Sequence, residues 1–206
     1  MKNLFFFFAL LFSGVCFAQT AEQNQILQDS RSFMKFLDQK NYEKILEMSH
    51  PALTEKFDKE MLIQAFKMVF EGNEELSMKI YPIDDNQYSV SEVFTEGTAK
   101  YAFVSFPMKM QMVFKKQKLD DAAKKMMINA MEVQGMKAHF TDDSTVEVNK
   151  LALTLALKDQ STNNIWKYIN HDDNNAIYTS IVPVEIIKKA RSYYSDLLIK
   201  QKENAN

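Results

Sequence analysis

The feature that most constrains the fold is a long stretch in which apolar residues occupy every second position. All the even-numbered positions of this stretch are apolar: Ala102, Val104, Phe106, Met108, Met110, Met112 and Phe114. The odd-numbered positions include Ser105, Lys109 and Gln111. Because a strand points successive side chains to opposite faces, the pattern predicts a strand with one long buried face and one face toward water. Pro107 cannot donate to a strand ladder and therefore predicts a bulge, a bend or an edge.

The residues before this strand predict a group of helices. Residues 21–40 and then residues 42–46 carry apolar side chains at helical spacing. Asn41 is suited to cap the second of these helices, and Asp58 to cap a third that carries two apolar residues in each turn. Gly72 is suited to end that third helix.

In the rest of the chain, segments with apolar residues at every second position alternate with segments in which apolar residues have helical spacing. Period-two segments predict strands at residues 78–83, 88–94, 137–140, 145–157, 165–170 and 176–182. Helical spacing returns in a Met-rich segment over residues 119–135 and again after Pro183. The sequence therefore predicts an α+β fold. N-terminal helices pack on a bent antiparallel sheet, with an inserted Met-rich helix and a C-terminal helix, in one domain over residues 19–206.

The first residues have the pattern of a secretory signal peptide. Lys2 precedes an uncharged apolar run over residues 4–12, and the small residue Ala18 precedes Gln19. The pattern predicts a signal peptide over residues 1–18, cleavage between Ala18 and Gln19, and a periplasmic or secreted protein. Spanning a bilayer takes roughly 20 apolar residues, so neither this run nor any later segment is expected to anchor the chain. The residues before Cys16 do not fit a lipoprotein cleavage site, and Cys16 is expected to leave with the signal peptide.

Composition excludes several classes of chemistry. A net charge of −2 without a basic block disfavours nucleic acid as a partner. Cys16 is the only cysteine, so a chain cut after Ala18 has no disulfide and no thiolate nucleophile. The later glycines, Gly72, Gly97 and Gly135, lie too far apart to form a phosphate-binding loop.

Two segments resemble a known family. Residues 33–46, which read FMKFLDQKNYEKIL, look like a helix, a polar break, an aromatic residue and a second helix. Residues 165–169, which read IWKYI, look like a late strand with a tryptophan near its start. In this order the chain resembles the NTF2-like (cystatin-like α+β) superfamily, and also small exported proteins of flavobacteria and their relatives. The resemblance implies a cone-shaped sheet and a homodimer. It implies no single function, because the superfamily includes isomerases, dehydratases, binding proteins and structural modules.

The methionines suggest a binding surface. Seven of the 13 methionines fall between Met108 and Met136. Thioether groups can bind Cu(I), but same-face residues on a strand are about 6.8 Å apart, so Met108 and Met112 would be about 13–14 Å apart, too far to share an ion. No metal and no cofactor are therefore expected. The alternatives are a filled core and an apolar pocket for a lipophilic small molecule. The residues expected to line such a pocket are Phe106, Met108, Met110, Met112, Met127, Met131 and Trp166.

The sequence gives weaker evidence for a catalytic site than for a binding surface. Glu92, Tyr101 and Glu147 lie on expected strands and could supply an acid or base inside the sheet. The three histidines match no metal-binding spacing: His50, His139 and His171. The paired aspartates sit mostly at expected turns or helix starts and are interpreted as solvated: 84/85, 120/121, 142/143 and 172/173. The sequence favours a non-catalytic binding or interaction module, and the alternative is a small isomerase- or hydratase-type enzyme acting on an apolar substrate.

Overall fold

Two long antiparallel strands form the spine of the molecule. In the computed structural model, which describes residues 19–203, β4 spans Ala99–Phe114 and β6 spans Thr145–Lys158. They pair from Lys100 opposite Lys158 to Val113 opposite Thr145. The alternating stretch is therefore a strand, as predicted, and even-numbered residues of β4 face the same side as even-numbered residues of β6. We refer to the two sides of this spine as the even face and the odd face.

Short strands extend the spine along both of its outer edges, giving a seven-stranded antiparallel sheet. Those on β4 are β1 (Leu76–Ile80), β2 (Ser89–Val90) and β3 (Phe94–Glu96). Those on β6 are β5 (Lys137–Phe140) and β7 (Lys167–Asn170). The expected strand over residues 88–94 is thus divided between β2 and β3.

The sheet narrows to its two central strands halfway along. Among residues 19–203, no strand pairs with the outer edge of β4 over residues 106–109 or with the outer edge of β6 over residues 150–153. We call this region the waist. Pro107 lies in it, and its nitrogen points to the open edge, because Lys109, two residues on, accepts a hydrogen bond at that edge from Tyr81 N at 2.9 Å. The proline therefore interrupts no ladder bond, and of the three predicted alternatives, a bulge, a bend or an edge, the structure shows the edge.

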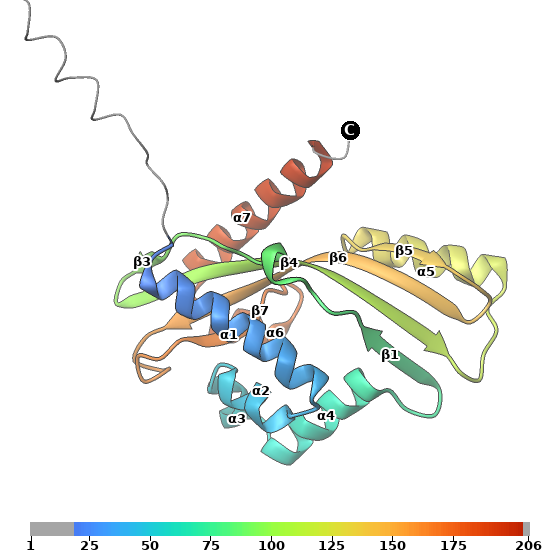
Figure 1. The fold of residues 1–206 in the computed structure, drawn as a ribbon, viewed down its shortest axis with the longest axis horizontal. Helices are drawn as coiled ribbons and strands as arrows, with labels where there is room; N and C mark the ends of the chain where they lie inside the picture. The colour runs from blue at the N-terminus through green and yellow to red at the C-terminus, as the bar shows by residue number, and fades with distance from the viewer. Residues whose placement is uncertain (1–18, 204–206) are drawn as a thin grey trace, which may run out of the picture.

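Seven helices of the described residues surround the spine (Figure 1). They are α1 (Ala21–Asp38), α2 (Tyr42–Met48), α3 (Ala52–Lys56), α4 (Lys59–Glu71), α5 (Asp121–Val133), α6 (Ala176–Ile181) and α7 (Val184–Glu203), with a 3-10 turn, η1 (Asp85–Gln87). Asn41 and Asp58 cap α2 and α4 through their side-chain oxygens, as the sequence predicted. In Figure 1, α2, α3 and α4 gather below the spine, while α5 and β5 lie at its far end from β3.

One half of the spine is covered on both faces. The even face packs under α1 in a cluster that includes Ile26, Val104 and Trp166. The odd face packs under α7 in a second cluster that includes Phe103 and Ile186. The expectation that the odd face is exposed to water is therefore wrong for this half. Tyr101, Phe103 and Ser105 are 5%, 0% and 4% exposed. The sequence pattern of β4 alone cannot predict that α7, which begins more than 80 residues after Phe103, covers the odd face.

A second expectation is wrong near the C-terminus. Residues 176–182 were predicted as a strand, and most of them form α6. Asn175 stabilises the helix start, because its side-chain oxygen accepts hydrogen bonds from the backbone nitrogens of Ile177 and Tyr178. A six-residue helix is too short for its period to stand out from an alternating pattern. The predicted signal peptide, residues 1–18, lies outside the described residues.

Candidate functional site

The predicted pocket residues lie in three places. Phe106 and Trp166 belong to the cluster under α1, where Trp166 is buried. Met110 and Met112 are half-buried on the even face beyond the waist, where they pair with Ile80 and Met78 of β1. Met127 and Met131 are half-buried on α5. The seventh residue, Met108, lies at the waist and lines an open groove.

The waist groove is the hollow that Met108 borders. Its volume is about 440 Å³, within the range of roughly 300–1,000 Å³ usual for small-molecule sites. β4 contributes Pro107, Met108 and Lys109, and β6 contributes Asn149, Lys150 and Leu151. The remaining lining residues are Tyr81, Pro82, Gln87, Gly135, Lys137 and Gln201. The groove exists where the outer strands stop, so the narrowing of the sheet creates it.

On one side of the groove, two lysines lie close to the ring of Tyr81, and one of them is paired with a carboxylate. Lys109 Nζ lies 2.9 Å from Glu147 Oε2 and 4.9 Å from the ring centre of Tyr81, and Lys79 Nζ lies 5.0 Å from the same ring centre. The hydrogen bond to Glu147 raises the pKa of Lys109, and the same bond lowers the pKa of Glu147. Glu147, one of the candidate acids or bases, is therefore held as a carboxylate beside a lysine on the odd face.

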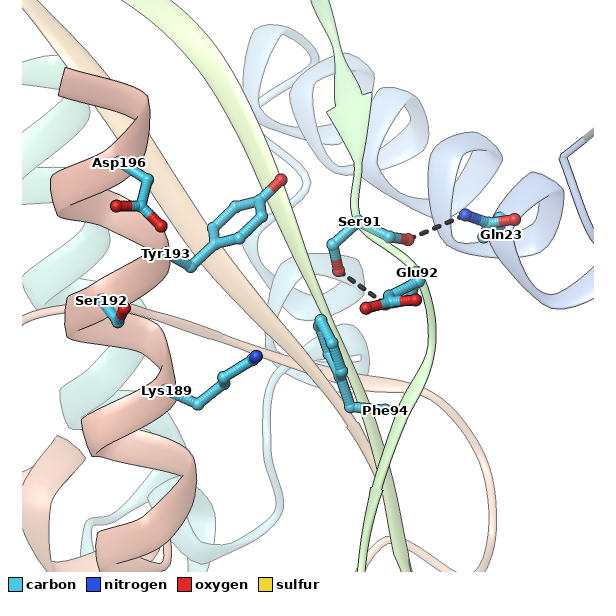
Figure 2. Close-up of a pocket in the computed structure, with 8 residues that line it drawn as sticks. All are labelled: Gln23, Ser91, Glu92, Phe94, Lys189, Ser192, Tyr193 and Asp196. Carbon is cyan, nitrogen blue, oxygen red and sulfur yellow. Dashed lines mark hydrogen bonds between the residues drawn. The ribbon is translucent and has the colours of Figure 1, made fainter. Parts of the chain in front are cut away.

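A second hollow lies between α1, the segment after β2 and α7 (Figure 2). Its volume is about 410 Å³, and its lining is Gln23, Ser91, Glu92, Phe94, Lys189, Ser192, Tyr193 and Asp196. Gln23 Nε2 donates to the backbone oxygen of Ser91 at 2.9 Å, and Ser91 Oγ accepts from Phe103 N at 2.9 Å. Lys189 Nζ lies 4.8 Å from the ring centre of Phe94. These contacts tie α1, β4 and α7 together around the hollow, and Glu92 at its rim is exposed.

His50 forms a serine–histidine pair that is not arranged for nucleophilic catalysis. Its Nδ1 accepts a hydrogen bond from Ala52 N at 3.3 Å, which leaves the proton on Nε2. Nε2 lies 3.4 Å from Ser161 Oγ, and Ser161 Oγ donates to Asp159 Oδ1 at 2.6 Å. The histidine therefore faces the hydroxyl as a donor and cannot remove its proton. The pair ties two loops together.

His171 belongs to a polar cluster at α7 in which the side chains of His171 and Tyr178 are buried. Its Nδ1 lies 3.0 Å from the hydroxyl of Tyr178 and 3.8 Å from Asp173 Oδ1, and Arg191 Nε lies 2.7 Å from Asp173 Oδ2. Burial lowers the pKa of His171 and raises that of Tyr178. Neither hollow is lined by these residues, so the cluster packs α7 against the turn that precedes α6. The sequence predicted the turn but gave no sign of the cluster.

The remaining polar candidates are structural. His139 is largely exposed, with Nε2 3.7 Å from Glu147 Oε2. Asp120 caps α5, Asp142 accepts from Ser144 N, and Asp172 accepts from Asn174 N. Among residues 19–203, no three or more histidine, aspartate or glutamate side chains are grouped to hold a metal ion. None of the helices in that range is long and apolar enough to cross a membrane.

The fold and the groove together define an α+β protein with an open, lysine-lined hollow at the waist of an antiparallel sheet. No family model matches the chain, and no curated protein and no solved structure matches it either.

Proposed function

We propose that the protein is an exported, non-catalytic binding module whose binding surface is the waist groove. The size and the lining of this groove are the main support for the proposal. The groove is a hollow of about 440 Å³ that combines apolar side chains, including Pro107 and Leu151, with several lysines and amides. Sites for small molecules typically combine an apolar lining with a few polar groups in this way.

The state of the acid–base candidates supports binding over catalysis. Glu92 is exposed to solvent, and Glu147 is paired with Lys109. Tyr101 is buried against Phe94, with ring centres 5.3 Å apart, and burial raises its pKa, so it stays protonated. An acid–base enzyme needs a group of tuned pKa beside its substrate. None of these three residues lines the groove.

The proposal includes the expectations from the sequence. A signal peptide ending at Ala18 delivers the chain outside the cytoplasm, where the groove would bind a lipophilic small molecule. The NTF2-like resemblance and a homodimer belong to the same proposal, and the mass measurement below also reports the dimer.

Native mass spectrometry of the protein recovered from the exported fraction tests the proposal, with a denatured, solvent-extracted sample beside it. We expect additional mass that disappears on extraction. The additional mass should also be absent from Pro107→Glu, which places a charge in the groove, and present in Met68→Glu. Met68 is a matched control because it is 62% exposed on α4 and does not line the groove. An unliganded mass for the unmodified protein, or equal ligand loss in both variants, would contradict the proposal.

A further inference from the structure

Lysines collect on the odd face of the spine beyond the waist, in a chain whose net charge is −2. Lys109 of β4 pairs with Asn149 of β6, and Asn149 pairs with Lys137 of β5. The two lysines therefore share a face and are separated by two strand spacings of about 4.8 Å each. Lys79 of β1 lies one row further along the same face. This part of the surface is positive although the whole chain is weakly acidic.

The positive charge in the groove is only partly neutralised. Lys109 has Glu147 as its partner at 2.9 Å. Lys137 also lines the groove on the odd face, and within residues 19–203 it takes part in no ion pair and no side-chain hydrogen bond. Lys150 pairs with Met108, so its side chain is on the even face. Like charges near one another favour an added anion, and Asn149, between Lys109 and Lys137, can donate a further hydrogen bond.

The same groove has an apolar side. Pro107 and Leu151 pair across the two central strands on the odd face and line the groove next to the Tyr81 ring. Gly135 leaves its rim open, because a side chain there would meet nothing within 4 Å. A ligand that satisfies both sides needs an acidic group for the lysines and an apolar body for the proline and leucine side chains.

We propose that the waist groove binds a small amphipathic anion on the odd face, with a carboxylate or phosphate head at Lys109 and Lys137 and an apolar tail along Pro107 and Leu151. This inference rests on the proposed binding function and names the chemical class of its ligand. The head group takes the place of the missing counterions, and Glu147 keeps Lys109 extended along the odd face.

Isothermal titration calorimetry with four ten-carbon probes tests the inference: decanoate, decyl phosphate, decanol and decyltrimethylammonium. Decanoate or decyl phosphate should bind at least roughly tenfold more tightly than decanol, and the cation should bind most weakly. The preferred acid identifies the head group. The double variant Lys109→Gln/Lys137→Gln should weaken acid binding roughly threefold to tenfold and leave decanol binding unchanged, since exposed ion pairs contribute modestly. Lys125→Gln, on the exposed side of α5, should change neither.

The possible failures are distinguishable. If decanol binds as tightly as the acids in a manner abolished by Pro107→Glu, the ligand class is wrong and the binding function stands. If acids bind equally well to the unmodified protein and to the double lysine variant, the head-group assignment is wrong. If no probe binds and native mass spectrometry also finds no ligand, the inference and the proposed function both fail.

Discussion

Two buried histidines should make the stability of this protein depend on pH just below neutrality. His50 is 4% exposed, and the side chain of His171 is 7% exposed. Burial lowers the pKa of both below the reference value of 6.5, although nearby carboxylates oppose the shift. In the unfolded chain the two histidines therefore become protonated near pH 6.5, while in the folded chain they stay neutral until a lower pH. The stability is fully present above that pH and is lost as the pH falls toward the folded-state pKa values.

The size of the effect follows from proton linkage. Each histidine that is charged only in the unfolded state lowers the free energy of unfolding by up to about 1.4 kcal/mol per pH unit. The two together give a limiting slope of about 2.7 kcal/mol per pH unit. Carboxylates with lowered pKa values, such as Glu22 and Asp143, contribute at lower pH, because their reference values are 4.5 and 3.8. The interval between about pH 6.5 and pH 5.5 therefore isolates the histidines.

Urea unfolding at several pH values measures the slope. Trp166, the only tryptophan, is 7% exposed and reports unfolding through its fluorescence. We expect His50→Gln and His171→Gln each to remove about half of the slope, whatever they do to absolute stability. A slope in the unmodified protein below about 0.5 kcal/mol per pH unit would refute the reasoning, and so would an undiminished slope in the double variant His50→Gln/His171→Gln.

Further predictions concern the fold. Phe103→Ala should lower the free energy of unfolding by about 3–5 kcal/mol in urea titrations, because Phe103 is fully buried among three aromatic rings; a loss below about 1 kcal/mol would mean that α7 does not pack there. Gly72→Ala should cost more than Gly135→Ala in the same assay. Both have positive φ, but a Cβ at Gly72 would lie 2.2 Å from the backbone oxygen of Leu76, whereas Gly135 faces open space; equal losses would contradict the close approach. Asn175→Ala should cost about 0.5–2 kcal/mol by removing the cap of α6, and an unchanged midpoint would count against that helix.

Local patterns in the sequence predicted the order of most elements. The alternation in β4, the caps at Asn41 and Asp58, and the edge position of Pro107 depend on neighbouring residues, and the structure confirms all of them. The α6 helix was mistaken for a strand because six residues contain too little of either period. The burial of Phe103 could not be predicted from β4, because it depends on α7 packing from a distant part of the chain.

The candidate site was predictable only in part. Met108 was expected to line a pocket and borders the waist groove, but its pairing with Lys150 directs its side chain to the even face. Met127 and Met131 share its chemistry but lie on α5 and line neither hollow. The basic side of the groove was not predicted. Lys109 and Lys137 come from two strands, and only the pairing register brings them to one face.

The most direct test of binding at the waist is an NMR spectrum of the protein labelled with 13C at its leucine methyl groups, recorded during titration with decanoate. Single Leu→Met variants assign the signals of Leu151 and Leu62. The account predicts that the Leu151 methyl groups, on the odd face of the groove, shift with saturation behaviour while those of Leu62, on α4, do not. An unshifted Leu151, or shifts confined to Leu62, would contradict binding in the waist groove.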